Sequence, residues 1–491
     1  MKTNGYRIQK PGEHRERKTV AGRRCLSCQQ SWSMCDCRQH RLRHQSRSSS
    51  SRASSSNHSS PRNTSSNVAS PRYSDLNLVG LEPLPCKITD AFFLFVGDLS
   101  SPITDVFTLS FMKTYLKSSI PIRAIVTTIG NILLEYERQS DLSSWQAAAA
   151  ALAAQDRPRL NGYLDMLTSP EYEDQHLTLL FGNLLAYMEL MVARSWCLFE
   201  AVLNKLSDKI RGQLGEERRT PFLYFDRGLL MNFSLLKAYS ALILRQDTFL
   251  AGSDLYDPSP FVDIDSSISQ VRANAAILHH YCKWVAYFAR CHHKATRFVR
   301  ESRHTAASLQ NKIGDVTKEE LRHALSEAGL LKVAEEIIES SYKITTVLDV
   351  LRASDEDDEA LEGGDFSYLR DVYYRFAHMA LTRTFSDPIW KLIGEDVPAI
   401  LDLPDLETYG LAILERFERR APVAGLESWS YLPILMGVAF EVKKPEDQKR
   451  VENLVMSIAE KGFASAESML GDMRLLWKMG SAFKNSMGIG L

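Results

Sequence analysis

The sequence has no long apolar segment. Its longest unbroken apolar run is Ala147–Ala154, whereas a helix needs roughly 20 apolar residues to cross a bilayer. We therefore exclude a membrane-spanning protein, and the N-terminus lacks the apolar core of a secretory signal. The eight cysteines are not spread as a disulfide framework, because four of them crowd into residues 25–37, so we expect reduced thiols.

Catalytic signatures are missing as well. The sequence contains no phosphate-binding glycine loop, no nucleophile elbow and no zinc-protease helix. The absence of these motifs does not by itself exclude an enzyme, but no positive signal favours one. We expect a protein without catalytic activity.

The near-zero net charge of −1 conceals a division of charge along the 491 residues. Residues 1–75 hold 15 Lys and Arg against 4 Asp and Glu, a balance of +11. The remaining residues hold 44 against 56, a balance of −12. A basic arm on an acidic body predicts that the arm alone meets nucleic acid or another acidic partner.

Composition divides the chain into four segments. We expect a basic disordered arm over residues 1–22, the cysteine-containing region over 23–44 and a Ser-rich disordered linker over 45–76. The linker has 14 Ser in positions 46–75, and such a segment cannot bury enough apolar surface to offset the entropy of ordering it. Residues 77–491 form a body large enough for a sizeable core.

The body has the pattern of an all-α domain, because strand-like alternation is scarce and apolar residues recur at helical steps. Such steps run from Leu177 to Leu206, which predicts one helix of about 30 residues. Ser144 is expected to cap an Ala-rich helix that continues through Ala154.

Two further helices have recognisable ends. Thr317 and Glu320 form a capping box at the start of one helix. Pro445 stands where another helix would begin, and Gly462 stands where it would end.

The sharpest local feature is a group of cysteines near the N-terminus. A Cys-x-x-Cys pair lets one tight turn supply two thiolates to a tetrahedral zinc ion, and a third thiolate six residues on can close around the same metal. We expect at most one zinc ion, bound by Cys25, Cys28, Cys35 and Cys37. The alternative is that the four cysteines are scattered in an unfolded arm.

The spacing from Cys25 to Cys35, followed by Asp36, resembles the first half of the fungal zinc-cluster DNA-binding domain, in which six cysteines hold two zinc ions. That family places Lys and Arg between its second and third cysteines, on a helix that meets DNA, whereas residues 29–34 carry no charge here. The family's second Cys-x-x-Cys and its sixth cysteine are also missing. The resemblance implies a reduced cluster, either lost in evolution or cut short by a mispredicted exon.

Basic residues flank the cysteines on both sides. They can neutralise phosphates without reading sequence, with an affinity that falls as salt rises. The residues expected to contact DNA are Arg23, Arg24, Arg38, Arg41 and Arg43. The basic run from Arg15 to Lys18 fits a nuclear-import signal, so we expect a nuclear protein; a solvated basic tail without a partner is the alternative.

Five pieces of the body follow one another in a recognisable order. They are Leu184–Glu189 with Trp196, Arg245–Thr248, Tyr431–Ala439, Gly462-Phe463 and Leu476-Trp477. Their order resembles the all-helical regulatory domain that follows the zinc cluster in many fungal transcription factors. The resemblance implies a domain that regulates transcription and binds partners, such as another transcription factor or the transcription machinery.

Histidines and cysteines lie close together in one stretch of the body. If residues 277–291 form one helix, His280 and Cys291 share a face but lie about 16 Å apart along its axis, too far to share an ion. We therefore favour core or interface histidines. The distant alternative is a helical enzyme whose pocket is lined by His279, His280, His292 and His293.

These patterns predict a nuclear fungal transcriptional regulator of the zinc-cluster type, which controls target genes through DNA binding by its arm. The alternative is a regulatory interaction protein that has a degenerate zinc cluster and acts through a DNA-binding partner. No heptad repeat follows the cysteines, so the coiled-coil signal for dimerisation is absent.

Overall fold

The chain divides into two units, Met1–Asn67 and Val68–Leu491, and every residue that can be described belongs to the second. The computed structural model describes residues 81–97, 101–139, 141–192, 196–216, 227–252, 270–313, 316–351, 368–392, 403–419 and 425–486. The predicted segments 1–22, 23–44 and 45–76 therefore lie outside the described residues. Within these residues every regular element is helical and none is a strand, which confirms the all-α prediction for the body.

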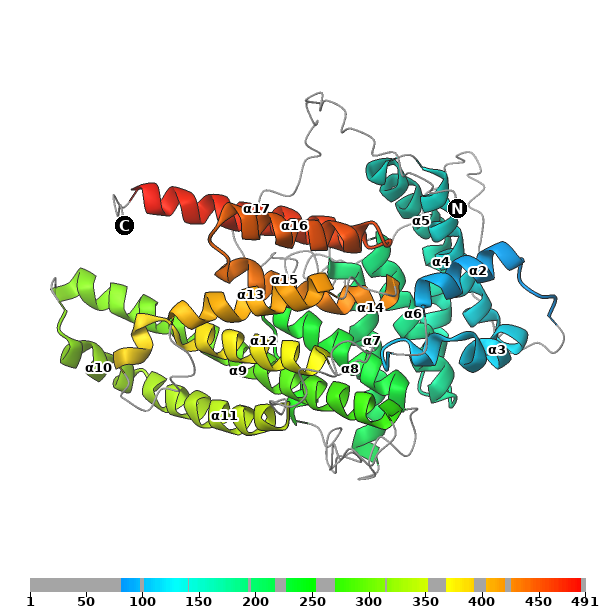
Figure 1. Ribbon diagram of the computed structural model, residues 1–491. Coiled ribbons are helices and arrows are strands. Elements are labelled where there is room, and N and C mark those ends of the chain that lie inside the picture. The colour runs from blue at the N-terminus through cyan, green and yellow to red at the C-terminus, as the bar shows by residue number, and fades with distance from the viewer. Residues whose placement is uncertain are drawn as a thin grey trace, which may run out of the picture. The chain divides into compact units, whose positions relative to one another are not determined.

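The helices follow one another in the order shown in Figure 1. The longer ones are α2 (Cys86–Val96), α3 (Leu109–Ser118), α4 (Ile120–Arg138), α5 (Leu142–Leu167), α6 (Gln175–Val192), α7 (Trp196–Glu216), α8 (Arg227–Ile243), α9 (Gln270–Ile313), α10 (Lys318–Glu327), α11 (Leu330–Leu351), α12 (Tyr368–Phe385), α13 (Leu403–Arg419), α15 (Leu432–Glu441), α16 (Pro445–Ala459) and α17 (Ala464–Ser486). The short ones are η3 (Asp105–Phe107), η5 (Phe249–Gly252), η8 (Pro388–Leu392), α14 (Gly425–Ser428) and η9 (Trp429–Tyr431).

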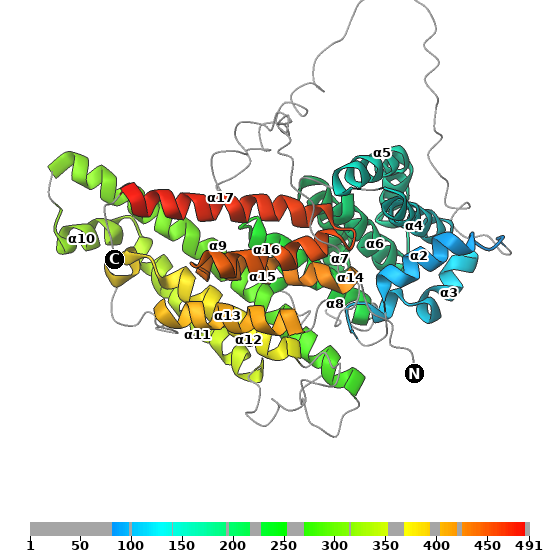
Figure 2. The same ribbon diagram turned by 45° about the horizontal axis from the view of Figure 1, so that its top comes forward.

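The C-terminal helices return to pack on the N-terminal ones. Helix α14 contacts α2, and α17 contacts α6 as well as α15 and α16. In Figure 2, α16 and α17 lie side by side along the body. At this junction the amide of Gln146 donates to Glu467 at 2.6 Å, so residues distant in sequence share one folded core.

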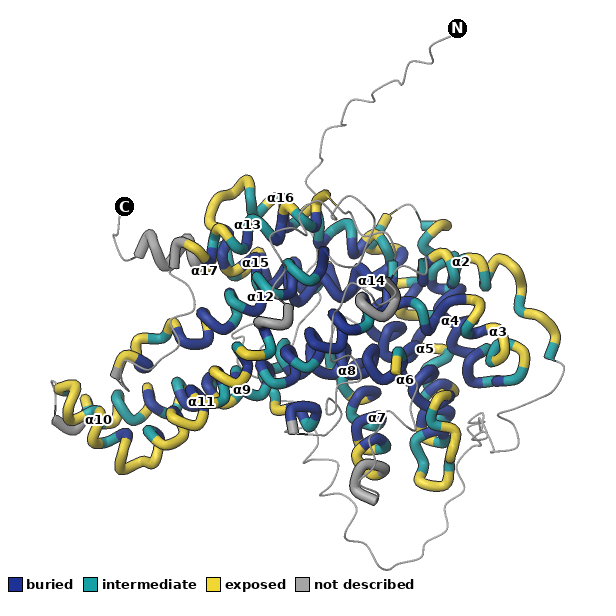
Figure 3. The backbone as a smooth tube through the Cα atoms, turned by 60° about the horizontal axis from the view of Figure 1, so that its bottom comes forward, coloured by how far each residue is buried: buried dark blue, intermediate teal, exposed yellow. Residues whose placement is uncertain are grey.

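Helices α6 and α8 form the centre of this core. Every residue from Leu177 to Val192 is buried, and so is every residue from Leu229 to Ala241 (Figure 3). A helix that is apolar on all sides is stable only where neighbours cover it completely. Several polar side chains on these helices are hydrogen-bonded, as where the Asn183 amide donates to the Leu229 carbonyl at 2.9 Å, whereas the buried Ser240 hydroxyl has no partner among the described residues.

The predicted single helix from Leu177 to Leu206 is wrong. The structure has two helices, α6 and α7, that pack against each other. A Cβ on Gly182 would fall 2.6 Å from the side chain of Leu206, whereas one straight helix would separate these residues by about 36 Å. Both helices bury an apolar stripe, so the periodicity continues across the reversal and does not reveal it.

Helix ends agree with the sequence where the capping signal is complete. In the Thr317 box, the Glu320 N–H donates to Thr317 Oγ1 at 3.2 Å and the Thr317 N–H donates back to Glu320 Oε2 at 2.9 Å. Helix α16 begins at Pro445, which confirms the predicted start. It ends at Ala459, three residues before Gly462, and Gly462, with φ of +110°, lies in the turn that follows.

The predicted cap at Ser144 is wrong by three residues. Helix α5 begins at Leu142, and Asp141 is its cap, accepting a hydrogen bond from the Ser144 N–H at 2.9 Å. Carboxylate and hydroxyl side chains cap about equally well, and here the Ser144 hydroxyl itself donates to Asp141 Oδ2 at 2.7 Å. The helix also continues beyond Ala154, through Pro158, to its end at Leu167.

None of the described helices combines the length and apolar character that a membrane crossing requires.

Helix α2 crosses α4 at Gly130, where a Cβ would fall 2.7 Å from the backbone oxygen of Ile88. That oxygen cannot move without shifting α2, so we expect Gly130→Ala to lower the free energy of unfolding by about 1–3 kcal/mol. Gly471→Ala in α17 is the matched control, because nothing lies within 4 Å of its added Cβ. Gly471→Ala should raise the free energy of unfolding by up to about 1 kcal/mol. Urea unfolding followed by circular dichroism measures both, and an unchanged Gly130→Ala midpoint would contradict this packing.

Candidate functional site

The residues predicted to bind zinc and DNA lie outside the described residues. They are Cys25, Cys28, Cys35, Cys37, Arg23, Arg24, Arg38, Arg41 and Arg43. Within the described part of the body, no group of three or more His, Cys, Asp and Glu side chains is placed to hold a metal ion. The polar site that the body does build lies where the end of α8 meets α9.

The turn that ends α8 is the polar stretch Arg245–Thr248. Arg245 has a left-handed backbone, with φ of 52°, and no other non-glycine residue in the described segments does. The Gln246 N–H donates back to the Ala241 carbonyl at 2.8 Å, which closes the helix as a glycine-ended helix would be closed. A left-handed arginine costs roughly 1–2 kcal/mol, so neighbouring contacts must hold the turn.

Two side chains of α9 hold it. His293 Nδ1 donates to the Arg245 carbonyl oxygen at 2.6 Å, and because a carbonyl oxygen only accepts, Nδ1 carries the proton. Arg290, one turn earlier, donates through Nε to Asp247 Oδ1 at 3.0 Å. The same carboxylate oxygen accepts the Thr248 N–H at 2.8 Å. The end of α8 is therefore fixed on the surface of α9.

His292 contacts α12 instead. Its Nδ1 lies 3.0 Å from Thr384 Oγ1. That hydroxyl donates to the Ala380 carbonyl at 2.9 Å, so the imidazole is the donor. Burial, with smaller contributions from the nearby Arg245 and His293, lowers the pKa of His292 to about 4. His292 is therefore uncharged at neutral pH and joins α9 to the end of α12.

The structure does not bring the four candidate histidines into one pocket. His279 and His280 are buried in the N-terminal half of α9. His292 and His293 lie about 18 Å further along the same continuous helix. The predicted single helix over residues 277–291 is confirmed, and with it the separation of His280 from Cys291.

The thiols of α9 are buried packing groups. Cys282 is fully buried, and burial raises its pKa far above the usual value. Burial also raises the pKa of Cys291 to about 12. A cysteine acts as a nucleophile or metal ligand through its thiolate, which neither residue can supply at neutral pH.

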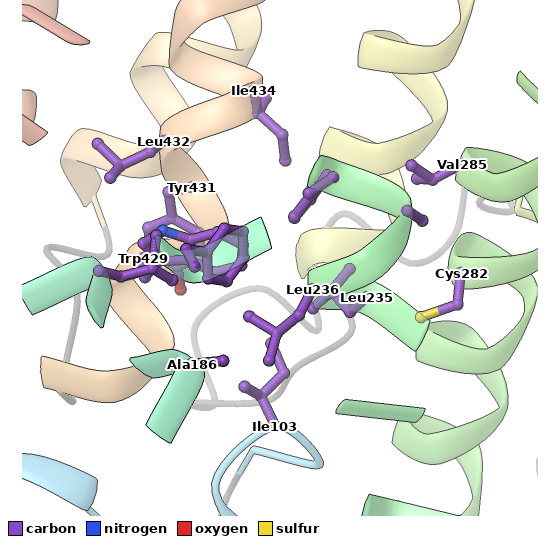
Figure 4. Close-up of a cluster of buried hydrophobic side chains, with 14 of the residues drawn as sticks. Ile103, Ala186, Leu235, Leu236, Cys282, Val285, Trp429, Tyr431, Leu432 and Ile434 are labelled. Carbon is purple, nitrogen blue, oxygen red and sulfur yellow. The ribbon is translucent and has the colours of Figure 1, made fainter. Parts of the chain in front are cut away.

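Figure 4 shows Trp429 and Tyr431 within a cluster of buried hydrophobic side chains, and the buried carboxylate of Glu427 lies beside them. Glu427 accepts hydrogen bonds from the phenols of Tyr431 and Tyr368. Burial, reinforced by the charge of Glu427, raises the pKa of Tyr431 well above its ordinary value. The indole of Trp429 lies against the ring of Tyr239, with centroids 5.6 Å apart. Glu427 and the two phenols satisfy one another, whereas the buried indole N–H of Trp429 has no hydrogen-bond partner among the described residues.

Comparisons with protein-family models, with curated proteins and with solved structures found no match.

The pattern of metal-ligand residues from Cys291 to His293 conceals a second feature, which is basic charge. Residues 290–304 hold five Lys and Arg against one acidic residue. This imbalance within a body of net charge −12 is visible in the sequence alone.

The depressed pKa of His292 predicts a loss of stability in acid. The unfolded chain binds a proton near pH 6.5 and the folded chain only near pH 4, so stability should fall as the pH drops through this window, by at most about 3 kcal/mol. In His292→Gln this part of the pH dependence should disappear, as measured by urea unfolding at pH 7, 6, 5 and 4.5. The matched control is His304→Gln on the exposed face of α9. If both variants kept the wild-type pH dependence, His292 would not be its source.

Proposed function

We propose that this protein is a nuclear fungal transcriptional regulator of the zinc-cluster type. In this proposal the N-terminal arm engages DNA, and the helical body regulates the arm and binds other transcription factors or the transcription machinery. The observation that supports it is the division of charge: the arm has a balance of +11 around a Cys-x-x-Cys group, while the rest has −12. A polyanion is attracted to such an arm and repelled by such a body.

The arm would act through one metal ion and its flanking cations. Cys25 and Cys28, with Cys35 and Cys37, supply four thiolates for one tetrahedral zinc ion. Zinc would fold the short segment and bring the flanking arginines together, because a segment this small has no apolar core of its own. Arginine contacts to phosphate would position the arm, and contacts to base edges in the major groove would give specificity.

Native mass spectrometry of the full chain tests the metal. We expect one bound zinc ion, which is lost in Cys25→Ser because three thiolates bind zinc more weakly than four. Cys86→Ser is the matched control, since Cys86 is exposed on α2 and outside the arm. Absence of zinc in the wild type, or zinc retained in Cys25→Ser, would contradict this proposal.

A second function is favoured by the uncharged residues 29–34, which replace the basic stretch of the resembled family. In this alternative the protein keeps its helical body, has a degenerate zinc cluster and acts through a DNA-binding partner. Chromatin occupancy of the protein should then disappear when the partner regulator is deleted. Occupancy that persists without the partner supports direct binding by the arm.

A further inference from the structure

The outer half of α9 carries a face of basic side chains. At about 100° per residue, six basic residues fall within an arc of roughly 120°, which also contains Glu301. We call this set the α9 basic face: Arg290, His293, Lys294, Arg297, Arg300 and His304. The buried residues of the same stretch, such as Cys291, Ala295 and Phe298, lie on the other side of the helix, so the α9 basic face is turned to solvent.

Exposure confirms this orientation. Lys294, Arg297, Arg300 and His304 are all exposed. Along the axis the face spans about 21 Å from its first residue to its last. In Figure 3 the outer part of α9 lies beside α10 and α11, where exposed backbone predominates.

Carboxylates neutralise only part of this face. Asp247 pairs with Arg290, and Glu301 pairs with Arg297 at 2.7 Å. Both pairs are solvent-exposed, so they contribute little stability and exchange readily for another anion. Lys294 and Arg300 form no ion pair with any described residue. The backbone of Arg245 lies beside His293, and the charge of its side chain acts on the neighbouring His292.

We infer that the α9 basic face binds the phosphate backbone of nucleic acid, as a second contact beside that of the arm. The inference rests on the proposed function. Charge complementarity supports it: several cations in a row on one rigid helix fit a partner with regularly repeated negative charges, and B-DNA carries a phosphate about every 3.4 Å along each strand. The remaining body is acidic, so it repels DNA and leaves this face as the favourable approach.

The arm and α9 would bind the same polyanion at once. Two weak contacts carried on one chain strengthen each other through effective concentration. Phosphate contacts carry no sequence information, so α9 would set affinity and orientation while the arm would set the choice of site.

The salt dependence of DNA binding by the full chain tests this inference. Affinity for a 30-base-pair duplex is measured by fluorescence anisotropy from about 25 to 200 mM salt. Each lost phosphate contact reduces the slope of log K against log salt by about 0.9. For Lys294→Gln combined with Arg300→Gln, we expect a slope shallower by about 2 and an affinity at 100 mM salt lower by at least about fivefold.

The matched control is Lys113→Gln combined with Arg138→Gln, which changes the net charge equally on exposed residues of α3 and α4. It should keep the wild-type slope. An unchanged slope in the α9 variant would overturn the inference. A variant in which Arg38, Arg41 and Arg43 are all changed to Gln tests the proposed function separately. If this variant keeps the wild-type affinity for DNA, the proposed function is wrong.

An acidic protein segment is the competing partner. A fluorescent peptide of ten glutamates serves as its probe in the same assay. If the α9 variant no longer binds this peptide and yet keeps the wild-type salt slope for DNA, the α9 basic face binds an acidic protein. The inference is then wrong. If the DNA slope changes as expected, the inference stands whatever the peptide does.

Discussion

The body depends on the burial of one short segment, from Glu427 to Tyr431, in its centre. A buried carboxylate destabilises a fold unless hydrogen bonds satisfy it, and here the phenols of Tyr431 and Tyr368 donate to Glu427. The bulky Trp429 next to it fills the space between α6, α7 and α8, where the ring of Tyr239 contacts it. Helices from both halves of the chain therefore meet on this segment.

This central packing fixes the N-terminal half of α9, whereas the C-terminal half packs one side against α10 and α11 and exposes the other side to solvent. The phenols of Tyr239 and Tyr281 lie 2.8 Å apart, and the Tyr281 ring stacks on Tyr373 with centroids 3.5 Å apart. The N-terminal half of α9 is thereby held between α8 and α12. Beyond the turn at Arg245, the same rigid helix continues with residues 290–304 on its surface. A basic face on a rigid helix loses little entropy when it binds, which suits it to contact a stiff polyanion.

The helix ends that neighbouring residues determine were predictable from the sequence, whereas the chain reversal that depends on residues distant in sequence was not. The capping box at Thr317 and the start at Pro445 are set by neighbouring residues, so the sequence displays them directly. The reversal between α6 and α7 is set by packing on both sides, and Gly182 shows its role only when Leu206 is placed against it. The α9 basic face could have been predicted from residues 290–304, since the charge imbalance and the helical spacing are both in the sequence. The predicted zinc and DNA residues of the arm stay predictions.

We propose that basic segments on an acidic helical body hold nucleic acid. Photo-crosslinking of the full chain to a duplex that contains 4-thiothymidine, followed by peptide mapping, would locate these segments. We expect crosslinks in residues 23–43 and 290–304 and none in the buried segment around Trp429. Crosslinks elsewhere on the body, or a chain that forms none at low salt, would contradict this proposal.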